Sequence, residues 1–120
     1  MESILIVDDD INLCSFLSEE LNAKGYNARY LTDGESAVEF LIQNNPDLIL
    51  LDLNMPGKNG FDVQKEINNI PGFKSKVIIL TAQSDVKSAI ECAKLGASDF
   101  LCKPYDLAEL LSTINKVNHQ

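Results

Sequence analysis

The sequence has no tryptophan, a single histidine and only ten basic residues among its 120 positions. Its 18 acidic residues give a formal net charge of −8, which would repel a phosphate backbone, so direct nucleic-acid binding is not expected. Three cysteines are an odd number without metal-type spacing, and we expect them to be buried, reduced thiols. The lone histidine, His119, is expected to be a solvated residue rather than a catalytic group.

The sequence also lacks a long hydrophobic run, an internal repeat and a low-complexity segment. Without an apolar run of membrane-spanning length, no membrane association is expected. The first residues carry no basic leader, and this predicts a cytoplasmic protein. An apolar content of 45% and a charged content of 23% are typical of a globular protein, and we expect one domain over residues 1–120.

Four short apolar runs, at 4–7, 48–51, 77–80 and 100–102, have the composition of buried strands. A more polar run at 26–31 is expected to be an edge strand. Four segments outside these runs have the apolar spacing of helices. Their apolar stripes are Leu13, Phe16, Leu17 and Leu21; Val63, Ile67 and Ile70; Val86, Ala89, Ile90 and Ala93; and Leu107, Leu110, Leu111, Ile114 and Val117. The broadly apolar segment 35–43 is expected to be a further helix.

This alternation predicts an α/β fold in which five β-α units form a doubly wound, five-stranded parallel sheet with helices on both faces. Because crossover connections are right-handed, the carboxyl ends of the strands meet at one edge, where ligands bind in this architecture. Gly25 and Gly96 stand where helices are expected to end. The expected helix N-caps are Asp33 or Thr32, Ser84 and Asp106.

Charged and polar residues follow all four apolar runs. Asp8, Asp9 and Asp10 follow the run at 4–7, Asp52 the run at 48–51, Thr81 the run at 77–80 and Lys103 the run at 100–102. Clustered carboxylates repel one another and recruit a cation, and their oxygens suit a hard ion such as Mg²⁺. Lysine and threonine side chains can hold phosphate oxygens beside it. The sequence therefore predicts an aspartyl-phosphate site at this edge.

The chain resembles the receiver domain of two-component response regulators. The resemblance rests on four motifs spread over nearly the whole chain: ILIVDDD at 4–10, LILLDLNMPGKNG at 48–60, VIILTA at 77–82 and GASDFLCKP at 96–104. It implies a flavodoxin-like sheet with strand order 2-1-3-4-5, an order for which such a regulator is a standard example.

The resemblance also implies roles for individual residues. Asp52 corresponds to the phosphoacceptor. Asp9, Asp52 and the backbone carbonyl of Asn54 correspond to Mg²⁺ ligands, and Asp8 to an acid that reaches the ion through water. Lys103 corresponds to the phosphate-binding lysine, joined to Pro104 by a cis bond that would aim its ammonium into the site.

Thr81 corresponds to a switch hydroxyl that moves toward the phosphoryl group. Phe100 corresponds to a switch aromatic, and since it lacks a hydroxyl, burial of its ring would have to carry any coupling. Residues at the positions of Asn54 and Gln83 influence the lifetime of the acyl phosphate in the family.

By the same resemblance, a sensor histidine kinase or phosphotransfer protein would phosphorylate Asp52. The domain would promote its own Mg²⁺-dependent phosphorylation and dephosphorylation rather than act as an enzyme on a separate substrate. The output would come from the surface formed by 85–95, 98–102 and 106–117, acting on a downstream protein or an attached effector domain, or through a phosphorylation-dependent homodimer. The kinase, the pathway and the presence of an effector domain stay open.

Two alternatives remain. A haloacid-dehalogenase-type phosphatase would use Asp8 as nucleophile and Asp10 as general acid, but this leaves Asp52 and the loop after it unexplained. A degenerate receiver that only binds partners is disfavoured because the full set of site residues is present. Asp10 itself could be no more than a cap of the first helix.

Overall fold

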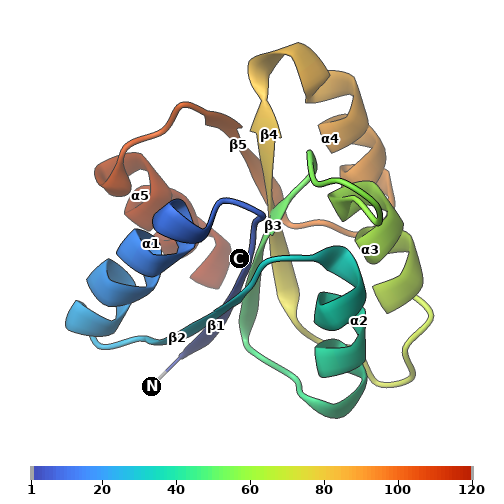
Figure 1. Cartoon of the computed structure of the whole chain (residues 1–120), viewed down its shortest axis with the longest axis horizontal. Coiled ribbons are helices and arrows are strands. Elements are labelled where there is room, and N and C mark those ends of the chain that lie inside the picture. Colours follow the sequence, from blue (N-terminus) through green and yellow to red (C-terminus); the bar gives the residue numbers. More distant parts are fainter. Residues whose placement is uncertain (1, 120) are drawn as a thin grey trace.

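Strands and helices alternate along the chain as the sequence predicts (Figure 1). The computed structural model describes residues 2–119, without the side chain of Gln83. The elements are β1 (Ser3–Val7), α1 (Ile11–Ala23), β2 (Asn27–Leu31), α2 (Gly34–Gln43), β3 (Leu48–Asp52), α3 (Gly60–Ile67), β4 (Lys76–Ala82), α4 (Val86–Lys94), β5 (Asp99–Lys103) and α5 (Leu107–Asn118), with a 3₁₀ turn at Gln83–Asp85 before α4.

The strands form one parallel sheet in the order β2-β1-β3-β4-β5, which confirms the predicted fold and the edge position of β2. In this order β1 and β3 are neighbours, with Val7 paired to Leu51. The residues that follow Val7 therefore lie beside Asp52, the last residue of β3. On the other side of β3, Asp52 pairs with Leu80 of β4.

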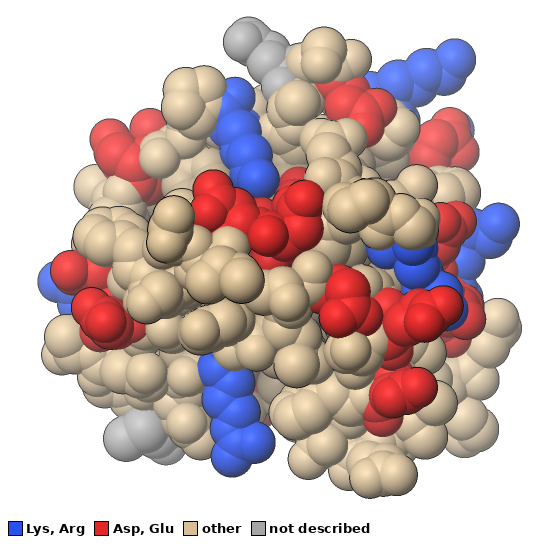
Figure 2. Space-filling model, in the orientation of Figure 1, with Lys and Arg blue, Asp and Glu red and all other residues tan. Residues whose placement is uncertain are grey.

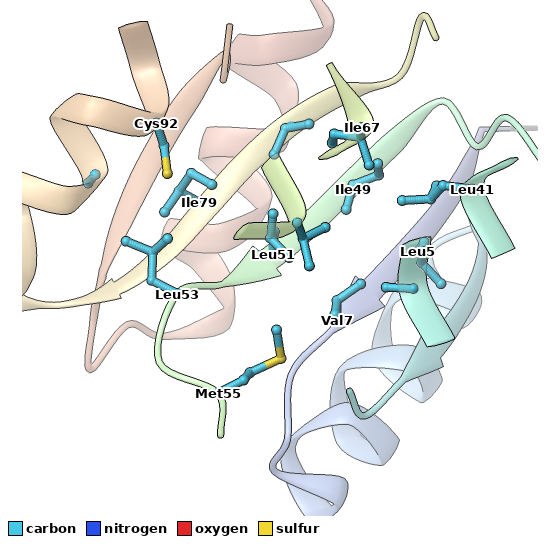
Figure 3. Close-up of a cluster of buried hydrophobic side chains, with 14 residues drawn as sticks. Leu5, Val7, Leu41, Ile49, Leu51, Leu53, Met55, Ile67, Ile79 and Cys92 are labelled. Atoms are coloured by element: carbon cyan, nitrogen blue, oxygen red, sulfur yellow. The ribbon is translucent and has the colours of Figure 1, made fainter. Parts of the chain in front are cut away.

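Alternate residues of the strands face two separate cores. Odd-numbered positions such as Val7, Leu51 and Ile79 pack under α2, α3 and α4, as Figure 3 shows for part of this cluster. Even-numbered positions such as Ile6 and Leu50 pack under α1 and α5, the two helices on the opposite side of the sheet in Figure 1. Because each central strand is covered on both faces, its sequence is a continuous apolar run.

The observed helix caps match the predicted ones at all but one position. Asp33 and Asp106 accept hydrogen bonds from the backbone N–H groups of Ser36 and Glu109, as expected of N-caps. Gly25 and Gly96 adopt positive φ angles just past α1 and α4. The Ser84 prediction is wrong, because the 3₁₀ turn moves the N-cap of α4 to Asp85, which makes no side-chain cap hydrogen bond.

Two of the predicted helical stripes are rotated relative to the observed cores. Phe16 of α1 is 50% exposed and Ile90 of α4 is 48% exposed, whereas Cys14 and Cys92 are buried in their place. At 3.6 residues per turn, Phe16 lies about 120° around α1 from the centre of the buried face. Both cysteines act as small apolar core residues. The predicted stripes left them out, so the predicted buried faces are rotated away from the observed ones.

The three cysteines are free, as expected, and Cys102 is only half-buried. His119 is exposed. No helix in the described part of the chain is both long and apolar enough to cross a bilayer.

Candidate functional site

Asp8 directly follows β1 and is fully buried at the carboxyl edge of the sheet. Its backbone N–H donates to the carbonyl of Leu31 at the end of β2. Its Oδ1 accepts the backbone N–H of Asp10 at 3.0 Å. The Asp10 carboxylate in turn accepts the N–H of Leu13, so Asp10 is the N-cap of α1. Asp8 is thereby fixed between the strand and the helix.

Asp52 ends β3 and is only 1% exposed. Its Oδ1 accepts the backbone N–H of Asn54 at 3.2 Å, which holds the carboxylate toward the following loop. That loop is anchored by Met55, a buried side chain in the α2–α3–α4 core (Figure 3). Gly60 packs so closely on the backbone carbonyl of Asp52 that a Cβ atom at this position would clash with it.

Lys103 joins the two buried acids. Its Nζ lies 3.1 Å from Oδ2 of Asp8 and 3.4 Å from Oδ1 of Asp52. Lys103 ends β5, and its bond to Pro104 is cis, as the family resemblance implies. The ammonium therefore bridges two carboxylates, one directly after β1 and one at the end of β3. Asp8 and Lys103 are 95 residues apart along the chain.

The pKa values of Asp52 and Lys103 depart from their ordinary values in this group. Burial, and then the charge of Asp8, raise the pKa of Asp52 from 3.8 to about 6, although Lys103 and the N–H of Asn54 oppose the rise. Burial lowers the pKa of Lys103, but the two carboxylates outweigh it and the net pKa is raised. At neutral pH Asp52 is thus ionised, and more basic than an ordinary aspartate.

Asp8, Asp9 and Asp52 each offer a carboxylate oxygen, and these oxygens lie within 4.8 Å of one another. Asp9 is exposed whereas the other two acids are buried, so the group opens to solvent on the Asp9 side. Figure 2 shows acidic side chains gathered on the surface where β1 leads into α1 in Figure 1. An all-oxygen cluster of this charge fits a hard divalent cation such as Mg²⁺. Burial is the first cause of the raised pKa of Asp52, and the second, repulsion from Asp8, is what a cation would relieve.

Thr81 and Phe100 lie farther from this cluster. The buried Thr81 hydroxyl contacts the backbone carbonyls of Ala82 and Asp85, at 3.1 and 3.3 Å, and within the described residues it makes no hydrogen bond to Asp52 or Lys103. Phe100 is 37% exposed on β5, so its ring is not buried as coupling would require. Asn54 is exposed, and the side chain of Gln83 lies outside the described residues.

Sequence reasoning missed Tyr105, two residues beyond Lys103. Its hydroxyl oxygen is buried, and the carboxylates of Asp8 and Asp52 act on it. An aromatic residue after an apolar run is usually part of a core, and no spacing in the sequence indicates that its hydroxyl is buried without a partner among the described residues.

A family model described as the response regulator receiver domain matches residues 4–115. The transcriptional regulatory protein CpxR of Klebsiella pneumoniae is 40% identical over 117 residues, which cover 98% of this chain and 49% of that protein. The response regulator ArlR of Staphylococcus saprophyticus is 38% identical over 114 residues, 95% of this chain and 51% of that protein. The chain thus spans about half the length of these relatives.

Solved structures agree with this likeness. The chemotaxis response regulator CheY4 of Vibrio cholerae superposes with a TM-score of 0.90 at 30% identity, covering 98% of each chain. A putative response regulator from Chloroflexus aurantiacus gives a TM-score of 0.89 at 32% identity, covering 99% of this chain and 98% of that one. None of these findings supports the phosphatase alternative with Asp8 as nucleophile. The fold, the acidic edge and these likenesses together show that the chain belongs to the receiver domains of two-component response regulators.

Proposed function

We propose that this receiver domain accepts a phosphoryl group on Asp52 from a phosphohistidine of a sensor kinase or phosphotransfer protein. The observation that carries the proposal is the Lys103 ammonium bridging Asp8 and Asp52 beside a third carboxylate, Asp9. This arrangement combines a nucleophile, a fixed positive charge and a cation-binding group, the parts that phosphoryl transfer requires.

Among the described residues, only one oxygen of the Asp52 carboxylate has a partner. Oδ1 is engaged by Lys103 and by the N–H of Asn54, so Oδ2 is the oxygen that attacks phosphorus. A P–O bond forms as the P–N bond of the phosphohistidine breaks, and the imidazole takes the electron pair as it leaves. Because Asp52 is only 1% exposed, the residues around its carboxylate must move to admit the donor.

Asp9, Asp52 and the backbone carbonyl of Asn54 would hold Mg²⁺, with Asp8 reaching it through water. When bound, the ion would neutralise charge on the transferring oxygens. Lys103 would supply a second positive charge to the phosphoryl oxygens. The same residues would position a water for the slower hydrolysis of the acyl phosphate, in keeping with a domain that promotes both its phosphorylation and its dephosphorylation.

The response would start at Thr81. In this conformation its hydroxyl is held by the carbonyls that precede α4. New acceptor oxygens on Asp52 would draw the hydroxyl toward the site, release those carbonyls, and bias α4 and β5 toward a second conformation in which the ring of Phe100 turns inward.

The changed surface of α4, β5 and α5 would act on a downstream protein or an attached effector domain, or support a phosphorylation-dependent homodimer. We further propose that residues 1–120 form a single receiver domain that works in the cytoplasm. Its net charge of −8 supports the view that this domain does not itself bind nucleic acid.

The test is intact-mass spectrometry after incubation with acetyl phosphate and Mg²⁺. The wild-type chain should gain one labile phosphoryl group, Asp52→Asn should gain none, and Asp33→Asn, a change at an exposed helix cap, should behave as wild type. Phosphorylation that survives in Asp52→Asn but is lost in Asp8→Asn would refute the proposal.

A further inference from the structure

The hydroxyl oxygen of Tyr105 is buried and has no hydrogen-bond partner among the described residues. Tyr105 follows the cis Lys103–Pro104 bond in the segment that runs from β5 to α5 (Figure 1), and its ring packs against the core under α1 and α5. A buried phenol normally finds a partner, because its hydrogen bonds with water are otherwise lost without replacement. An unpartnered hydroxyl beside a charged site therefore needs an explanation.

The surroundings of this hydroxyl are acidic. Burial raises the pKa of Tyr105, and the charges of Asp8 and Asp52 raise it further, with smaller effects of Cys14 and Asp10. The phenol accordingly keeps its proton at neutral pH. The ring packs against the core that contains Cys14, whose thiol donates to the backbone carbonyl of Asp8 at 3.2 Å, and Asp8 is also the carboxylate with the largest effect on the phenol.

Asp8 is occupied by other donors in this conformation. Its Oδ1 accepts the N–H of Asp10 at 3.0 Å, and its Oδ2 accepts Nζ of Lys103 at 3.1 Å. Lys103 is shared with Asp52, at 3.4 Å. A phosphoryl group on Asp52 would carry more negative charge than the carboxylate alone and would draw Lys103 away from Asp8. Asp8 is fully buried, and because the proposed Mg²⁺ would reach it only through water, the departure of Lys103 would leave its Oδ2 without a direct donor, which is costly for a buried carboxylate.

We propose that Tyr105 is a positioning residue that replaces Lys103 as the hydrogen-bond donor to Asp8 when Lys103 moves to the phosphoryl group. The inference rests on the proposed phosphorylation of Asp52. It explains why a buried donor has no partner among the described residues of the unmodified protein, since its partner becomes available only after modification. The hydroxyl then stabilises the phosphorylated state and not the unmodified one.

The test is Tyr105→Phe, which keeps the buried ring and removes only the hydroxyl, with Tyr30→Phe as a matched control at an exposed tyrosine of β2. Urea unfolding of the unmodified protein should show that Tyr105→Phe is as stable as wild type or more stable. Calorimetric titration with beryllofluoride and Mg²⁺, which mimic the acyl phosphate, should show about tenfold weaker binding, the loss expected for one hydrogen bond to a charged group. Tyr30→Phe should match wild type in both measurements.

Each other outcome overturns the inference. If Tyr105→Phe binds beryllofluoride as tightly as wild type, the hydroxyl has no role in the modified state. If the variant loses stability in the unmodified protein as well as affinity, the hydroxyl is structural and does not switch partners. If wild type itself fails to bind beryllofluoride, the proposed phosphorylation of Asp52 fails, and the role of Tyr105 fails with it.

Discussion

Replacement of Asp52 by asparagine should make the unmodified, metal-free protein more stable at neutral pH. The fold raises the pKa of this carboxyl from 3.8 to about 6, chiefly through burial and the charge of Asp8. Between these two pH values the folded protein binds more protons than the unfolded chain. The stability of the wild type therefore falls as pH rises from about 4 to about 6, and the neutral amide escapes this loss.

The difference between 3.8 and about 6 corresponds to about 3 kcal/mol, at about 1.36 kcal/mol per pH unit. The variant also loses the 3.4 Å contact with Lys103, which offsets part of the gain. We expect Asp52→Asn to raise the free energy of unfolding by about 1–3 kcal/mol at pH 7 and to have no such advantage below about pH 4.

The assay is urea unfolding followed by circular dichroism from pH 4 to pH 8, with a chelator present. Added Mg²⁺ should stabilise the wild type and narrow the gap, because a ligand that binds the folded state raises its stability. Asp33→Asn is the control, because the pKa shift of Asp33 has the opposite direction: the N–H of Ser36 holds the pKa of this carboxyl below its ordinary value. The Asp33→Asn variant should lose a little stability or none. A variant at position 52 that is less stable than wild type at pH 7, or whose gain does not depend on pH, would refute this reasoning.

Three further predictions concern the same region. Lys103→Met should raise the pKa of Asp52 above about 6 in a carboxyl-carbon NMR titration, because Lys103 now lowers it; an unchanged or lower pKa would contradict the contact seen here. Gly60→Ala should cost about 1–3 kcal/mol of stability in urea unfolding, because its Cβ would clash with the carbonyl of Asp52; a neutral effect would show that the loop yields freely. In thiol labelling of the folded protein, half-buried Cys102 should react before Cys14, whose pKa burial raises to about 12; the reverse order would be inconsistent with the fold.

The sequence was most informative where one physical requirement dominates. The central strands are covered on both faces, so their apolar runs predicted them directly, and parallel strands bring Asp8, Asp52 and Lys103 to one edge whatever the details of the loops. The strand order was not derivable in this way, because apolar runs do not specify which strands are neighbours. It came from the family resemblance and is confirmed.

Finer features, such as the position of an N-cap or the buried face of a helix, depend on local alternatives that differ little in free energy. The N-cap of α4 moved from Ser84 to Asp85 because a 3₁₀ turn precedes the helix. Ile90 is exposed because the buried face of α4 is centred on Ala89 and Cys92, residues too small to dominate an apolar pattern. The direction of a side chain such as Tyr105 is set by tertiary contacts, which no spacing in the sequence encodes.

The most direct measurement is a crystal structure of the chain with Mg²⁺ and beryllofluoride. We expect the beryllium on Asp52, the ion held by Asp9 and Asp52, and Lys103 in contact with a fluoride. A beryllofluoride group on Asp8, or an ion bound away from the three carboxylates, would contradict the account.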